Sequence, residues 1–308
     1  AFFIGMGGDW ELAALSFAYP ILMIVMSVAI GLGAGTSSVV ARAIGANDPV
    51  RAARLATDSL LLSFIITGSI SFLGIMTIDR LFLTLGAPEE MIPLIRGYME
   101  ILYLGVPFVV VGMVGMSSMR ATGDTRSPSL LMIIASIANI AIDPIMIFGF
   151  GPIPAMGLKG AAMAALISRG AIFLGTIYFM SHRLNMLSYE KPSFSEMKSS
   201  WSDILHVGIP AAATNTIIPI ATAVITAMLA TYGPEVVAGF GVASRIESVV
   251  LVMFYALSAI IGPFVGQNLS AKKSKRIFQA LKQCSIFCLS VGLFFAAILI
   301  IYRDTLPL

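Results

Sequence analysis

The chain has 308 residues, of which 58% are hydrophobic and only 11% are charged, and its formal net charge is +3. Its mean hydropathy is +0.94. A soluble domain of this size would have to expose large apolar patches, so the composition excludes a water-soluble protein and indicates an all-α polytopic membrane protein.

Eight stretches are each close to the roughly 20 apolar residues that a helix needs to cross a bilayer. The predicted spans cover residues 12–36, 55–77, 93–118, 128–150, 158–181, 203–230, 236–264 and 278–302. The first residues have no basic region and no cleavage motif, so we do not expect them to be a signal peptide. We expect residues 1–5 to be the outer end of a helix whose beginning is absent.

Lysine and arginine predict the orientation of these spans. Of the 19 Lys and Arg residues, thirteen fall in one set of alternate loops and four in the other, while Arg169 and Arg245 lie inside spans. Residues 1–11 are therefore expected outside and the 182–202 loop in the cytoplasm. We expect Asp58, like Glu100, to reach the membrane interface, because both lie near span ends.

An internal repeat indicates how the spans are grouped. The segment 8–55 aligns without a gap onto 233–280, so equivalent residues are 225 positions apart. Both copies have the same orientation, which is typical of transporters built from parallel repeats. We therefore expect two six-helix lobes. Residues 1–181 would hold the end of helix 1 and helices 2–6, residues 182–202 a cytoplasmic linker, and residues 203–308 helices 7–9 of an incomplete second lobe. The parent protein should have about twelve spans, so the chain is expected to be a fragment.

A polar stripe interrupts the fourth span. Ser129, Ser136, Asn139 and Asp143 follow one another at helical spacing and would share one face. A carboxylate in hydrocarbon costs about 3 kcal/mol or more, and such acids are commonly functional. Pro144 leaves an earlier backbone carbonyl free beside the acid. The stripe predicts an ion or proton site facing a cavity; the alternative is a polar contact that joins two helices.

Two further groups of polar residues could line a substrate cavity. Arg245 and Glu247 lie inside the seventh span, and Asn215, Thr222 and Thr226 share one face of the sixth span. The acid could meet a cationic substrate, with the arginine setting its charge state. Structural pairing with neighbouring helices, or hydrogen bonds from the threonines to their own backbone, would explain the same residues.

Several motifs, in this order and with the repeat, resemble the multidrug and toxic compound extrusion (MATE) transporters, in the branch that includes DNA-damage-inducible protein F. They are Gly33–Gly35 with Val40–Asp48, Met119–Pro128, Asn139–Pro144 with Gly157–Ala162, and Val265–Asn268. The resemblance covers the whole chain. It implies that Asp143 and Asn139 belong to a cation-coupling site, with H⁺ or Na⁺ as the ion, completed by an acid of the first helix. The family often has a hydroxyl where this chain has Ala165.

The resemblance implies an antiporter of the inner (plasma) membrane that exports amphipathic, commonly cationic compounds by alternating access. Small-molecule substrates and membrane lipid would be its partners, and we expect a monomer. No cofactor is expected beyond the coupling ion, and no metal centre apart from Na⁺ at Asp143 and Asn139. We find no phosphate-binding loop or catalytic cluster, so we expect neither an enzyme nor a nucleic-acid partner. The alternative is a flippase for lipid or lipid-linked oligosaccharide, whose cavity should be more basic.

Overall fold

The computed structural model describes residues 9–151, 154–191 and 193–301. Its long helices are α2 (Asp9–Gly45), α3 (Pro49–Thr84), α4 (Ile92–Ala121), α5 (Arg126–Phe148), α6 (Gly157–Tyr178), α7 (Phe194–Ala230), α8 (Pro234–Ser270) and α9 (Ser274–Ile301). A short turn, η1 (Glu89–Met91), precedes α4, and a π-helical turn, η2 (Phe179–Arg183), follows α6. Within the described residues, eight helices are long and apolar enough to cross a membrane. This confirms the predicted all-α membrane fold.

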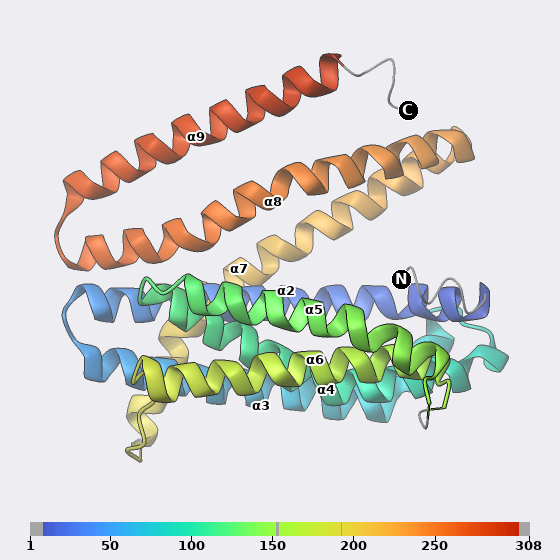
Figure 1. Cartoon of the computed structure of the whole chain (residues 1–308), viewed down its shortest axis with the longest axis horizontal. Coiled ribbons are helices and arrows are strands. Elements are labelled where there is room, and N and C mark those ends of the chain that lie inside the picture. The colour runs from blue at the N-terminus through green and yellow to red at the C-terminus, as the bar shows by residue number, and fades with distance from the viewer. Residues whose placement is uncertain (1–8, 152–153, 192, 302–308) are drawn as a thin grey trace.

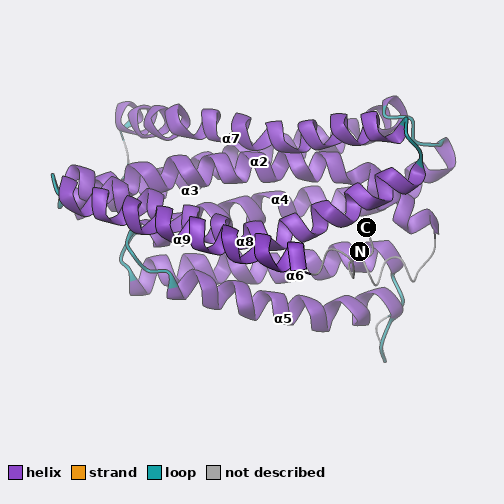
Figure 2. Ribbon diagram, turned by 90° about the horizontal axis from the view of Figure 1, so that it is seen from above, coloured by secondary structure: helices purple, strands orange, loops and turns teal. Residues whose placement is uncertain are grey.

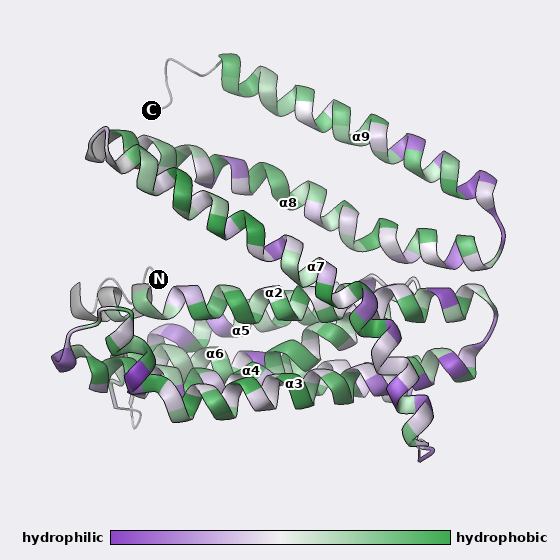
Figure 3. Ribbon diagram, turned by 180° about the vertical axis from the view of Figure 1, so that it is seen from behind, coloured by the Kyte–Doolittle hydropathy of each residue, from purple (hydrophilic) through white to green (hydrophobic). Residues whose placement is uncertain are grey.

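The helices run roughly parallel, and the loops that carry most of the lysines and arginines gather at one end. We call this the basic end; it contains residues 42–54, 120–126, 181–203 and 267–276. In Figure 1 it is on the left, and hydrophobic residues dominate the middle of the helices in Figure 3. Helices α2 to α6 form one group, α8 meets this group at the basic end and diverges from it with α9 toward the other end, and α7 crosses between the two. Seen from above, α7 and α5 lie at opposite edges of the bundle (Figure 2).

The turns after α2 and α8 have the same backbone geometry. Asn47 and Lys272, 225 positions apart in the sequence, have positive φ angles of 60° and 55°. In each turn the next N–H bonds to the carbonyl five residues earlier, at 3.0 Å after α2 and 2.8 Å after α8. Left-handed backbone is uncommon outside glycine. Its occurrence at equivalent positions shows that these two turns of the sequence repeat share one backbone geometry.

The core lies around α4, which packs against α2, α3 and α6. Val110 and Val114 are fully buried and one turn apart, and Met99 and Met119 are also inaccessible to solvent. Helix α9 differs, because none of its described residues is buried. The apolar surface of α9 is therefore suited to contact with lipid, whereas α4 is packed against other helices on most of its sides.

Helix α7 approaches α2 closely through small residues. A Cβ atom added at Gly31 would lie 2.5 Å from the carbonyl oxygen of Gly208, and one added at Gly35 would lie 2.2 Å from that of Ile204. Backbones can come this near only where side chains are absent, which is the packing that small residues four apart favour in membranes. The first half of α7 is thus fixed to α2.

Candidate functional site

Asn139 and Asp143 form a hydrogen-bonded pair on α5. The Asn139 side-chain amide donates to a carboxylate oxygen of Asp143 at 3.3 Å. One helical turn separates the two residues, so the spacing of the sequence directly produces the contact. Both side chains are half-buried, and Pro144 follows inside the same helix. The pair places an acid and an amide within one turn, and Pro144 has no N–H to donate to the carbonyl four residues earlier.

The rest of the predicted stripe is not part of this pair. Ser129 is exposed, and its hydroxyl donates to the Thr125 carbonyl at 2.7 Å. Ser136 is also exposed. Helix α5 packs mainly against α6 and makes few contacts with α4. The pair therefore lies on a helix with one well-packed side.

The structure does not bring the other cavity candidates to the pair. Arg245 and Glu247 are exposed on α8. On α7, the side chains of Asn215, Thr222 and Thr226 donate to carbonyls four residues earlier, at 2.8, 3.0 and 2.8 Å. These bonds satisfy the donors within their own helix. Their role in binding a substrate stays a prediction.

The α4–α5 turn fixes the start of the helix that carries the pair. One carboxylate oxygen of Asp124 accepts from the N–H groups of Arg126 and Ser127 at 3.0 Å, and the other accepts from the Ser127 hydroxyl at 2.6 Å. Burial acts to raise the pKa of Asp124, but the bonds from Ser127 and Arg126 outweigh it and hold this pKa below its ordinary value. Arg183 also donates to the Ser127 hydroxyl, at 3.2 Å.

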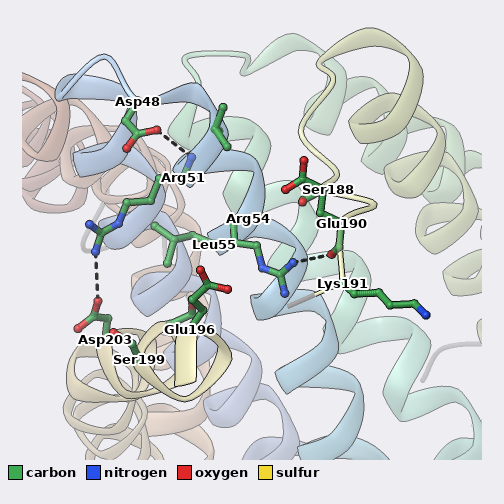
Figure 4. A pocket seen from close by; sticks show the side chains of 12 residues that line it. Asp48, Arg51, Arg54, Leu55, Ser188, Glu190, Lys191, Glu196, Ser199 and Asp203 are labelled. Atoms are coloured by element: carbon green, nitrogen blue, oxygen red, sulfur yellow. Dashed lines mark hydrogen bonds and ion pairs between the residues drawn. The ribbon is translucent and has the colours of Figure 1, made fainter. Parts of the chain in front are cut away.

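A polar cavity of about 450 Å³ lies at the basic end, between the start of α3, the linker and the start of α7 (Figure 4). Its lining residues are Asp48, Val50, Arg51, Arg54, Leu55, Ser188, Glu190, Lys191, Glu196, Ser199, Ser200 and Asp203. Both signs of charge are present. Arg51 extends across it toward Asp203, at 3.9 Å, and a second cavity of about 270 Å³ is lined by these two residues and by the end of α2.

Arg54 joins α3 to the linker beside this cavity. Its guanidinium donates to both carboxylate oxygens of Asp58, at 2.8 and 3.2 Å, and to the backbone carbonyl of Glu190 at 2.8 Å. The Asp58 side chain is only 1% exposed, and the Trp201 indole donates to the Asp58 carbonyl at 3.0 Å. The expectation that Asp58 reaches the interface is therefore wrong, because the linker and α7 cover it. The sequence did carry a signal for this ion pair, because oppositely charged residues four apart on a helix, such as Arg54 and Asp58, lie side by side.

The comparisons with known proteins identify the family. The MatE family model matches residues 1–145 and 210–308. This chain belongs to the MATE family. The FAD transporter of Shewanella oneidensis is 43% identical over 280 residues, which are 91% of this chain and 62% of that protein. The probable multidrug resistance protein YoeA of Bacillus subtilis is 27% identical over 283 residues, covering 89% of this chain and 61% of the relative. This MATE chain thus spans about three fifths of their length.

Solved transporter structures have the same arrangement of helices. The Vibrio cholerae MATE transporter VcmN in its bent form superposes with a TM-score of 0.88 at 29% identity, over 97% of this chain and 67% of that one. A MOP superfamily transporter from Pyrococcus furiosus gives a TM-score of 0.84 at 28% identity, over 98% and 66%. These findings confirm the predicted family and the predicted multi-pass membrane protein.

Proposed function

We propose that this MATE protein is a secondary antiporter that exports amphipathic compounds in exchange for H⁺ or Na⁺, with Asp143 and Asn139 as its coupling site. The observation that carries the proposal is the hydrogen bond between these residues, which holds a carboxylate inside a membrane helix. An acid at such a depth is costly unless it serves ions or substrates. Family membership favours this function over a lipid-linked oligosaccharide flippase.

The chemistry of the pair suits a site that alternates between charged and neutral states. An ionised Asp143 accepts the hydrogen bond from Asn139 and attracts a cation. A protonated Asp143 loses that charge and gains a donor, so its preferred neighbours change. For Na⁺, the oxygen ligands would be the Asp143 carboxylate, the Asn139 side-chain oxygen and the carbonyl four residues before Pro144. Each charge that crosses the membrane is worth about 2.3 kcal/mol per 100 mV.

Two substrate classes are candidates. Relatives named as multidrug resistance and multidrug export proteins favour amphipathic, commonly cationic compounds. The relative at 43% identity is named a FAD transporter, which favours an anionic flavin dinucleotide. The two classes need opposite charges in the cavity. Both Glu247 and Arg245 are exposed on α8. Glu247 would contact a cationic compound, and Arg245 would contact an anionic dinucleotide.

Export from cells that produce the protein at its natural full length tests the proposal. Ethidium and FAD are measured in parallel, with a proton or a sodium gradient imposed. We expect Asp143→Asn to reduce export at least tenfold, because a neutral amide cannot change its charge. The control is Ile137→Ala, which alters an exposed apolar side chain on the same helix. Equal export by Asp143→Asn and the unmodified protein would show that Asp143 is not the coupling residue.

A further inference from the structure

The basic ends of α8 and α4 are joined by one side-chain hydrogen bond between segments far apart in the sequence. The Gln267 amide on α8 donates to the carbonyl of Ala121, the last residue of α4, at 2.6 Å. Carbonyls in the last turn of a helix have no partner within it. The N–H of Asp124, three residues further on, donates to the Thr122 hydroxyl at 3.4 Å instead. The Ala121 carbonyl is therefore free to accept from Gln267.

Backbone packing surrounds this bond. A Cβ added at Gly45 would lie 2.1 Å from the Gln267 carbonyl oxygen and 2.7 Å from its carbonyl carbon. A Cβ added at Gly266 would lie 3.1 Å from the Cβ of Ala41, which is fully buried. Any side chain at Gly45 would thus force α2 and α8 apart. We call this set, Gln267 with Ala121, Gly45, Gly266 and Ala41, the closing contact.

The closing contact lies on the axis that relates the two copies of the repeat. Ala41 and Gly266 are 225 positions apart and therefore occupy equivalent positions. A pair of equivalent residues meets where a two-fold axis passes through an interface. From this point α2 and α8 diverge, and their other ends are far apart in Figure 1. The two helices therefore touch at the basic end and separate toward the opposite end.

We propose that Gln267 holds the basic ends of the two lobes together and must release the Ala121 carbonyl in each transport cycle. This inference rests on the proposed transport function. A short turn, residues 122–125, connects the Ala121 carbonyl to α5, which carries Asp143. A change in the position of α5 therefore reaches the closing contact through one covalent connection. Gln267 suits this role because a neutral amide donates to the negative end of α4 at any pH, whereas a carboxylate would be repelled.

A reversible crosslink tests whether the contact must open. In a background with Cys284→Ser and Cys288→Ser, the pair Ala41→Cys with Gly266→Cys brings two Cβ atoms near the 3.5–4.5 Å typical of disulfides. We expect oxidation to crosslink most of the protein and to lower ethidium or FAD export at least tenfold, and reduction to restore it. Complete crosslinking with undiminished export would overturn the proposal, as would failure to crosslink at all.

The control pair is Gly33→Cys with Ser117→Cys. Its Cβ atoms would be 3.6 Å apart, and it joins α2 to α4 within the first group of helices. We expect this crosslink to leave export within about twofold of the reduced protein, since α2 and α4 need not separate for the contact to open. A loss of export equal to that of the test pair would mean that any disulfide in this region is inhibitory, and the proposal would fail.

The rate at which the test pair crosslinks reports on Gln267 without any transport assay. We expect Gln267→Ala to slow disulfide formation at least fivefold, because the contact is closed for a smaller fraction of the time. Gln267→Glu should slow it more at pH 8 than at pH 5. Gln283→Ala, on the exposed surface of α9, is the matched control. An unchanged rate in Gln267→Ala would refute the role of Gln267. Absent export with the expected change in rate would instead refute the transport function alone.

Discussion

Polar contacts at the basic end differ in kind from those at the opposite end. At the basic end, Arg54 joins α3 to the linker across 136 residues of sequence, and Gln267 joins α8 to α4 across 146. At the opposite end, Arg96 pairs with Asp79 and Glu100, and all three side chains are more than 40% exposed. Contacts between segments far apart in the sequence fix how those segments are placed, whereas exposed ion pairs contribute little to stability. Among the described residues, the side-chain hydrogen bonds that span more than 100 residues of sequence therefore lie at the basic end.

The largest expected effect is that of breaking the buried ion pair. Asp58→Asn leaves the Arg54 guanidinium with an uncompensated charge under the linker, so we expect the free energy of unfolding to fall by about 3 kcal/mol. Unfolding in a detergent titration, followed by tryptophan fluorescence, measures it. Asp203→Asn removes the partner of Arg51, whose side chain is 63% exposed, and should cost about 0.5 kcal/mol or less. Equal losses in the two variants would contradict the distinction between buried and exposed pairs.

A smaller effect is expected at the start of α5. Asp124→Ala removes the acceptor for two N–H groups, so we expect a loss of about 1 kcal/mol at neutral pH. The pKa of Asp124 is lower in the folded protein than its ordinary value. Its contribution is therefore complete above the unfolded pKa of about 4 and is lost as the pH falls through the folded pKa.

The difference in unfolding free energy between the unmodified protein and Asp124→Ala, measured from pH 7 to pH 3, checks this sign. It should be constant down to about pH 5 and shrink below pH 4. Ser129→Ala, which removes an exposed hydroxyl one turn further along the helix, should show no such dependence on pH. A difference that grows in acid would mean that Asp124 has a raised pKa.

The smallest effect is expected at the opposite end. Arg96→Gln removes a cation that pairs with Asp79 and Glu100 on the surface. We expect no resolvable shift of the unfolding midpoint at physiological salt, because water and ions already screen these charges. The measurement is the same detergent titration at low and high salt. A midpoint shift as large as that of Asp58→Asn would remove the contrast between the two ends.

Local features could be predicted from the sequence. Long apolar runs predicted the eight membrane helices, because a segment in lipid must form the hydrogen bonds of its backbone within itself, as a helix does. The spacing of Asn139 and Asp143 gave their contact, since residues four apart share a helix face. The repeat anticipated the two turns at Asn47 and Lys272, which have the same geometry.

Contacts between distant segments could not be predicted in this way. Asp58 stands near the end of an apolar run, and the same position could face water or protein. Its burial depends on where Trp201 and the linker lie, more than 130 residues later. The partner of Gln267 could not be predicted either, because it is a backbone carbonyl, and every residue of the chain has one. The partner follows only from the crossing of α8 over α4.

The attachment of α7 to α2 has a mechanical consequence. Gly208 and Ile204 keep the first half of α7 on α2, while the second half continues beyond them toward α8. A swing of α8 and α9 away from α2 would therefore load the second half of α7 and the short turn that joins it to α8. Pro219 lies in that second half, whereas Pro210 precedes Ala212, which also packs closely on Gly31. A proline removes a backbone hydrogen bond and so softens the helix locally. How easily α7 bends would then limit how far, and how fast, the two groups of helices can separate.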